Sequence, residues 1–116
     1  RVLQAVPASI LVLKASFFND PQIRAQYTER FVDIALDKNA VGFNFKSKNK
    51  LKQRLVLLPQ TTSHQSHYAQ YNDIDIGLDA FPYAGTTTTM DALFMGIPVI
   101  SLRKGGSESS HAHNVG

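Results

Sequence analysis

Residues 81–98 read FPYAGTTTTMDALFMGIP and join two short apolar runs, residues 74–78 before them and residues 99–102 after them. A glycine ahead of four consecutive threonines favours a tight turn, and an apolar helical pattern follows the threonines. Gly96 and Pro98 then stand where a helix commonly ends. The stretch therefore predicts a strand, a turn, a short helix and a second strand.

The start of this predicted helix is a candidate site for an anion. Backbone N–H groups without partners gather at a helix N-terminus, and the helix dipole makes that end positive. The hydroxyls of Thr86, Thr87, Thr88 and Thr89 add further donors. In the alternative interpretation, one threonine caps the helix and the others fill the loop. The spacing differs from the Walker pattern and no lysine follows, so a P-loop is not predicted.

Two more apolar runs, residues 10–13 and 54–58, are typical of strands buried on both faces of a parallel sheet. Residues 21–36 carry an apolar stripe at helical spacing, and a short helix is expected over residues 67–72. The stripe consists of Ile23, Tyr27, Phe31 and Ile34. Strand and helix alternate along the chain, which predicts an α/β fold with a Rossmann-like, doubly wound parallel sheet.

Residues 37–53 are rich in lysine and asparagine and are interpreted as an insertion loop, although Val41, Phe43 and Phe45 alternate like a short edge strand. The formal net charge is +3, and much of the positive excess lies in this basic segment. Lys46, Lys48, Lys50, Lys52 and Arg54 lie close together at its end and directly after it. A solvated loop is the favoured interpretation, and a nucleic-acid surface is the alternative.

The composition excludes several classes of protein. A hydrophobic content of 43% with 18% charged residues excludes a disordered chain. No apolar run approaches the ~20 residues of a membrane span. The absence of cysteine excludes disulfides and thiolate metal sites and fits an intracellular protein. The chain opens like the last turn of a helix and stops on residues 111–116 without a closing helix, so we expect a piece of a longer protein.

In a doubly wound sheet, ligands bind outside the carboxyl ends of the strands. We therefore expect Lys14, the loops at residues 60–67 and 80–88, and the tail at residues 103–113 to meet at one edge. Lys14 would neutralise a phosphate or remain an ordinary surface lysine. Asp91, one turn into the predicted helix, would contact a ribose or only complement the helix dipole.

Two patterns suggest a metal, and neither is favoured. His64, His111 and His113 invite a zinc interpretation, but the His-x-His pattern has no closing pair of ligands. Asp73 and Asp75 resemble a short acidic metal motif of some glycosyltransferases, yet they run into the start of a buried strand. No metal is therefore expected.

Residues 73–99 resemble the C-terminal catalytic domain of protein O-GlcNAc transferases and their SPINDLY-type relatives. The run FPYAGTTTT and the final HAHNVG resemble the SPINDLY-type protein O-fucosyltransferases in particular, since O-GlcNAc transferases typically carry histidine where Thr86 stands. The opening AVPAS and Lys14 also fit this group, and only residues 37–53 fall outside the resemblance. SPINDLY proteins commonly have Glu at the position of Asp91, where this chain follows the O-GlcNAc transferases.

The resemblance implies the C-terminal, donor-binding lobe of a two-lobed B-type glycosyltransferase, with the N-terminal lobe and helical repeats outside this chain. It implies metal-independent, inverting transfer of a sugar to Ser or Thr hydroxyls of cytoplasmic or nuclear proteins, with no nucleic acid or membrane as partner. GDP-fucose is the favoured donor, UDP-GlcNAc the alternative, and an inactive sugar-nucleotide-binding scaffold a further alternative. The fragment alone is expected to be inactive, and it offers no identifiable catalytic residue.

The resemblance also implies donor contacts. These are His67 at the nucleobase, Asp91 at the ribose, Thr86, Thr87 and Thr88 around the diphosphate, and Lys14 at the donor phosphates. Further candidate contacts to the donor or the acceptor are Tyr83, His111, His113 and Asn114.

Overall fold

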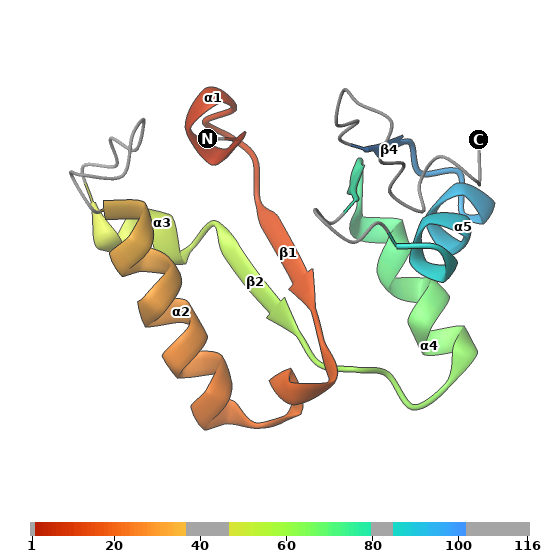
Figure 1. Cartoon of the computed structure of the whole chain (residues 1–116), viewed down its shortest axis with the longest axis horizontal. Helices are drawn as coiled ribbons and strands as arrows, with labels where there is room; N and C mark the ends of the chain where they lie inside the picture. The colour runs from red at the N-terminus through yellow and green to blue at the C-terminus, as the bar shows by residue number, and fades with distance from the viewer. Residues whose placement is uncertain (1, 37–46, 80–84, 102–116) are drawn as a thin grey trace, which may run out of the picture. The chain divides into compact units, whose positions relative to one another are not determined.

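The computed structural model describes residues 2–36, 47–79 and 85–101, which form two compact units, Arg1–Gln60 and Thr61–Gly116. Each unit contains helices and one two-stranded parallel sheet (Figure 1). Mixed helix and parallel strand confirm the α/β class. The described strands pair as β1 with β2 and β3 with β4, where the sequence predicts one continuous sheet.

The first unit supplies the two long apolar strands that the sequence predicts. Its elements are α1 (Val2–Ala5), β1 (Leu11–Lys14), the 3-10 helix η1 (Ser16–Asn19), α2 (Pro21–Leu36), α3 (Lys48–Lys52) and β2 (Leu55–Leu58). β1 and β2 run parallel, with Leu11 opposite Leu55 and Lys14 opposite Leu58. Both strands lie within one residue of their predicted positions, and α2 runs beside β2 (Figure 1).

The core of the first unit is a cluster of buried apolar side chains. Its members are Leu3, Val32, Ala35 and Leu51, with Leu11, Phe31 and Leu36 packed against them. The predicted stripe on α2 is wrong in part, because Tyr27 and Ile34 are 45% and 57% exposed. Val32 and the small Ala35 form the inward face instead, since they allow α2 to approach its neighbours closely.

The predicted insertion loop at residues 37–53 contains a helix, α3, and this part of the prediction is wrong. Leu51 is fully buried in the core, and this anchor holds a lysine-rich turn in helical form. Residues 37–46, with the possible edge strand of Val41, Phe43 and Phe45, lie outside the described residues.

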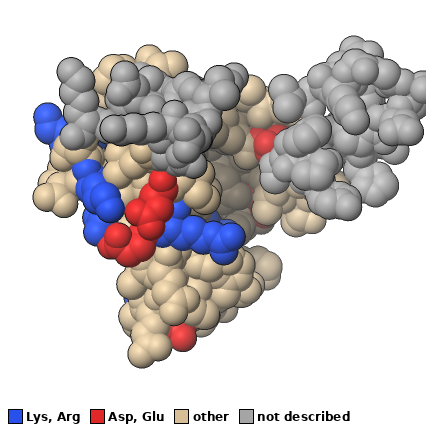
Figure 2. All heavy atoms as spheres, turned by 60° about the vertical axis from the view of Figure 1, so that its left-hand side comes forward, with Lys and Arg blue, Asp and Glu red and all other residues tan. Residues whose placement is uncertain are grey.

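The basic residues of this segment contact protein groups. Lys48 Nζ lies 3.5 Å from Asp33 Oδ1, and Lys52 Nζ pairs with the Glu29 carboxylate. Figure 2 shows acidic and basic side chains next to one another on this face. Arg54 donates from its guanidinium to the carbonyls of Ser9 and Val6, both at 2.7 Å, and so joins the start of β2 to the segment before β1. Exposed pairs of this kind contribute about 0–1 kcal/mol each, so their main effect is on the charge of the surface.

The second unit contains the threonine-rich stretch. Its elements are α4 (His64–Ala69), the 3-10 helix η2 (Gln70–Asp73), β3 (Gly77–Leu78), α5 (Thr87–Phe94) and β4 (Val99–Ile100). β3 and β4 run parallel, with Gly77 opposite Val99. The helix predicted over residues 67–72 begins earlier, because the Ser63 hydroxyl caps α4 by accepting from the Ser66 N–H at 3.1 Å.

The end of α5 confirms the predicted helix terminus. Gly96 has a positive φ of 77°, and its N–H donates to the Leu93 carbonyl at 3.0 Å. The Ile97 N–H donates to the Ala92 carbonyl at 2.8 Å, which completes a Schellman motif. Pro98 then prevents further helix and leads directly into β4. Within the described part of the chain, no helix is long and apolar enough to cross a membrane.

Leu51→Ala should lower the free energy of unfolding of the first unit by about 2–5 kcal/mol, because it leaves a cavity in a closed core. Lys50→Ala, on the exposed side of the same helix, is the matched control and should change it by less than about 0.5 kcal/mol. Urea unfolding followed by hydrogen exchange of peptides from residues 47–58 measures both. Equal effects of the two substitutions would contradict α3 as a core element.

Candidate functional site

The start of α5 presents hydrogen-bond donors that the described residues leave without partners. Thr86 occupies the N-cap position with φ −94° and ψ −63°, and its side chain makes no cap hydrogen bond. The Met90 N–H donates to the Thr86 carbonyl at 3.1 Å, while earlier N–H groups of a helix have no such partner. Thr86, Thr87 and Thr88 are exposed, and their hydroxyls have no hydrogen-bond partner among the described residues. The alternative in which one of these threonines caps the helix is therefore not what the structure shows.

Gly85 and Thr89 shape the turn ahead of these threonines. Thr89 Oγ1 donates to the Gly85 carbonyl at 2.6 Å. A Cβ atom on Gly85 would overlap the hydroxyl oxygen of Thr88. The expected tight turn thus uses glycine for close approach rather than for a left-handed backbone, since Gly96 is the described glycine with positive φ.

Asp79, directly after β3, is a site residue that sequence reasoning missed. Its Oδ1 accepts from the Gly85 N–H at 2.7 Å, and its Oδ2 accepts from the Ser101 hydroxyl at 2.9 Å. Its own N–H donates to the Ile100 carbonyl at 2.9 Å. An acidic residue at the carboxyl end of a strand was the available signal, but both of its side-chain partners are distant in sequence.

His67 on α4 and Asp91 on α5 lie in contact with each other. The family resemblance implies that both bind the nucleotide-sugar donor. His67 Nε2 lies 3.1 Å from Asp91 Oδ2, and the Tyr68 hydroxyl donates to Asp91 Oδ1 at 3.4 Å. The side chains of His67 and Asp91 are 25% and 20% exposed, so the contact is partly shielded from water. With a proton on Nε2, the imidazole donates to this carboxylate. The pair therefore fixes the orientation of the imidazole ring.

Aromatic side chains surround this pair. The His67 ring lies 5.4 Å from the Tyr68 ring and 5.4 Å, edge to face, from the Tyr71 ring. The Tyr68 ring also lies 5.9 Å from Phe94 at the end of α5. Burial, followed by the negative charge of Asp91 and then by Tyr68, raises the pKa of Tyr71 above its usual 10.0. Tyr71 is therefore a neutral phenol throughout the physiological range.

The remaining predicted residues belong to other parts of the sequence. Lys14 ends β1 in the first unit, at the carboxyl end of the strand as predicted. Tyr83, His111, His113 and Asn114 lie outside the described residues. Asp73 and Asp75 are exposed, and within the described ranges no group of three or more His, Asp or Glu side chains is placed to hold a metal.

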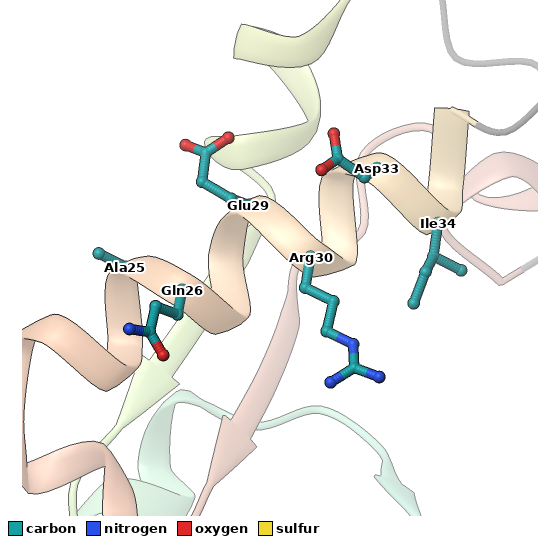
Figure 3. Close-up of a pocket in the computed structure, with 6 residues that line it drawn as sticks. All are labelled: Ala25, Gln26, Glu29, Arg30, Asp33 and Ile34. Carbon is teal, nitrogen blue, oxygen red and sulfur yellow. The ribbon is translucent and has the colours of Figure 1, made fainter.

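A surface hollow on α2 is separate from these residues (Figure 3). It is lined by Ala25, Gln26, Glu29, Arg30, Asp33 and Ile34, all from one helix. Glu29 and Asp33 project toward one side of the helix and Arg30 toward the other (Figure 3). Both carboxylates already pair with lysines of α3, so this hollow lacks a converging set of free polar groups.

Comparison with known proteins finds relatives that match the whole chain. No family model matches the chain. Over all 116 residues it is 38% identical to a protein of Solanum lycopersicum, 37% to one of Petunia hybrida and 37% to one of Arabidopsis thaliana. Each of the three is named "Probable UDP-N-acetylglucosamine--peptide N-acetylglucosaminyltransferase SPINDLY". Over its whole length the chain is similar to part of these SPINDLY proteins, which supports the O-GlcNAc transferase family.

The similarity to SPINDLY proteins confirms the resemblance that the motifs indicate. It extends through residues 37–53, which the motif-based resemblance leaves out. The chain spans 10–11% of the length of these curated relatives, although they match 100% of it. What the complete protein does is therefore taken up as a proposal below.

Asp91→Asn should lower the pKa of Tyr71 toward its usual 10.0, because it removes the second-largest cause of the upward shift. The folded protein holds this phenolic proton more tightly than the unfolded chain, so stability should fall as the pH rises above about 10, and less steeply in the variant. NMR titration of ring-labelled tyrosine, assigned with Tyr71→Phe, measures the pKa.

Asp73→Asn is the matched control, since Asp73 is two residues from Tyr71 in sequence but is not a cause of its shift. An unchanged Tyr71 pKa in Asp91→Asn, or an equal change in the control, would contradict the placement of Asp91 beside the aromatic rings.

Proposed function

We propose that this chain is part of the donor-binding lobe of an inverting glycosyltransferase that acts on Ser or Thr hydroxyls of proteins. The observation that carries the proposal is α5, which combines three threonine hydroxyls at its N-terminus, without partners among the described residues, with Asp91 one turn later. The printed names of the relatives, probable peptide N-acetylglucosaminyltransferases, support protein glycosylation. Parallel pairing in both units supports a Rossmann-like lobe of the B type.

The start of α5 fits the diphosphate of the donor. Free N–H groups and the positive end of the helix dipole attract an anion, and the hydroxyls of Thr86, Thr87 and Thr88 add donors. In the reaction, an acceptor hydroxyl attacks the anomeric carbon and the nucleoside diphosphate leaves. Hydrogen-bond donors that are already in place stabilise the negative charge that develops on the leaving diphosphate. They lower the barrier because they do not have to reorganise during the reaction.

The cluster at His67 fits the nucleoside. The His67 ring is held by Asp91 and flanked by Tyr68 and Tyr71, and a fixed, partly exposed ring suits stacking on a base. Each carboxylate oxygen of Asp91 has a further lone pair beyond its bond to His67 or Tyr68. Those lone pairs suit the hydroxyls of a ribose.

GDP-fucose is the proposed donor, and UDP-GlcNAc is the alternative. Threonine at position 86 and the final HAHNVG favour the SPINDLY-type O-fucosyltransferases. Asp91 and the name of the relatives, which specifies UDP-N-acetylglucosamine, favour the alternative. An inactive sugar-nucleotide-binding scaffold is a further candidate, because the described residues offer no group to activate the acceptor hydroxyl.

We further propose cytoplasmic or nuclear protein acceptors, catalysis without a metal, and no nucleic-acid partner. The donors at the start of α5 can balance the diphosphate charge without a cation. Three of the five basic side chains that suggested a nucleic-acid surface contact protein groups instead.

Calorimetry of the complete protein against GDP and UDP tests the donor. We expect GDP to bind at least about tenfold tighter than UDP, a difference of about 1.4 kcal/mol, with the same affinity in the presence of EDTA. Preference for UDP would assign UDP-GlcNAc, and failure of both to bind would overturn the proposed function. Sugar transfer to a Ser/Thr peptide library then distinguishes an enzyme from a scaffold.

Lys14→Ala should weaken GDP binding by about 1–3 kcal/mol if its ammonium meets the donor phosphates, as charged hydrogen bonds do. Lys50→Ala removes an exposed lysine of α3 and is the matched control, with no expected change. The same titrations measure both variants. Unchanged affinity in Lys14→Ala would return this residue to the role of a surface lysine.

A further inference from the structure

Asp79 joins three segments at the carboxyl ends of β3 and β4. Its carboxylate receives the Gly85 N–H at 2.7 Å from the turn before α5 and the Ser101 hydroxyl at 2.9 Å from the end of β4. Its backbone N–H continues the pairing of β3 with β4 through the Ile100 carbonyl at 2.9 Å. One side chain thus ties the turn that starts the candidate diphosphate site to both strands beneath it.

The Gly85 end of this link is itself rigid. The Gly85 carbonyl accepts from Thr89 Oγ1 at 2.6 Å, and its α-carbon approaches Thr88 too closely for a side chain. A shift of Gly85 would therefore disturb the bond that holds the Thr89 hydroxyl. The bond from Asp79 to Gly85 thus acts directly on the turn that leads into α5.

We propose that Asp79 is a positioning residue for the diphosphate of the donor, acting through Gly85 and Ser101 rather than by touching the ligand. This inference rests on the proposed function, which assigns the start of α5 to the diphosphate. Both carboxylate oxygens accept from protein donors, so the observed bonds of Asp79 act on Gly85 and Ser101. A negative charge beside an anion site would oppose binding, so its benefit has to come from geometry.

The two substitutions at Asp79 separate geometry from charge. In Asp79→Asn the amide oxygen still accepts from the Gly85 N–H, and the amide nitrogen can donate to the Ser101 oxygen. Asp79→Ala loses both bonds. We therefore expect Asp79→Asn to keep its dissociation constant for GDP and its donor KM within about threefold of wild type. Asp79→Ala should raise both at least about tenfold, since small displacements of positioning groups have effects of this size or larger.

The experiment combines hydrogen exchange and kinetics on the complete protein. Exchange at the Gly85 amide, read in peptides that begin several residues before Gly85, should accelerate in Asp79→Ala and not in Asp79→Asn. The acceptor KM should stay unchanged in both, whereas a general loss of folding would alter it and kcat as well. Asp75→Ala removes an exposed carboxylate four residues earlier and is the matched control, with no change expected in either readout.

Each outcome decides between the two proposals. Equal loss of donor affinity in Asp79→Asn and Asp79→Ala would assign Asp79 a role by charge and overturn its positioning role. Unchanged Gly85 exchange in Asp79→Ala would overturn it also. If exchange at Gly85 accelerates in Asp79→Ala but the wild-type protein binds neither GDP nor UDP, the link from Asp79 to Gly85 is upheld and the proposed function is refuted. If Asp79→Ala does not fold, Ser101→Ala is the substitute variant, because it removes one of the two bonds to the Asp79 carboxylate. It should raise the donor KM by about threefold or more. An unchanged donor KM would count against the proposal.

Discussion

Close packing of α5 on the β3–β4 pair is the constraint on which the candidate site depends. Ala92 on α5 is buried, and a Cβ atom on Gly77 would lie 3.8 Å from the Ala92 Cβ and 3.1 Å from a methyl of Val99. Larger residues at Gly77 or Ala92 would force the helix away from the strands. At the observed approach, the start of α5 lies within reach of Asp79, whose carboxylate spans the gap to Gly85. The distance between α5 and the β3–β4 pair thus sets the positions of the N–H and hydroxyl groups at the start of α5.

The two ends of α5 differ in how far their hydrogen-bonding groups are satisfied. At the C-terminus, the Schellman bonds of Gly96 and Ile97 satisfy carbonyls that a helix end leaves open. At the N-terminus, Thr86 makes no cap bond, although a capping threonine is commonly worth about 1 kcal/mol. A helix start whose first threonine makes no cap bond gives up local stability. A bound anion would offset this loss of stability, because it would accept hydrogen bonds from the threonine hydroxyls.

The local features of the fold could be predicted from the sequence, and those that depend on distant contacts could not. Gly96 and Pro98 mark the helix end by their own backbone preferences, and the runs at β1 and β2 carry their strand character in composition. Leu51 is a single apolar residue among lysines, so only the packing of the first unit reveals that it anchors a helix. The inward face of α2 also follows packing, because Ala35 and Val32 fit where Tyr27 and Ile34 do not. Asp79 has partners 6 and 22 residues away, and no periodic pattern points to them.

The contact between His67 and Asp91 links the position of the Asp91 carboxylate to the way in which the proposed nucleotide-sugar donor would be held. The two residues are 24 apart in sequence, and sequence reasoning assigned them separately to the base and the ribose. In the structure the Asp91 carboxylate is held by His67 at one oxygen and by Tyr68 at the other. A glutamate, the residue common in SPINDLY proteins at this position, is longer by one methylene and would carry its carboxylate beyond the present bonds. The ring of His67 and the carboxylate therefore have to be matched as a pair, and in the proposed function Asp at position 91 would decide how the nucleoside is held.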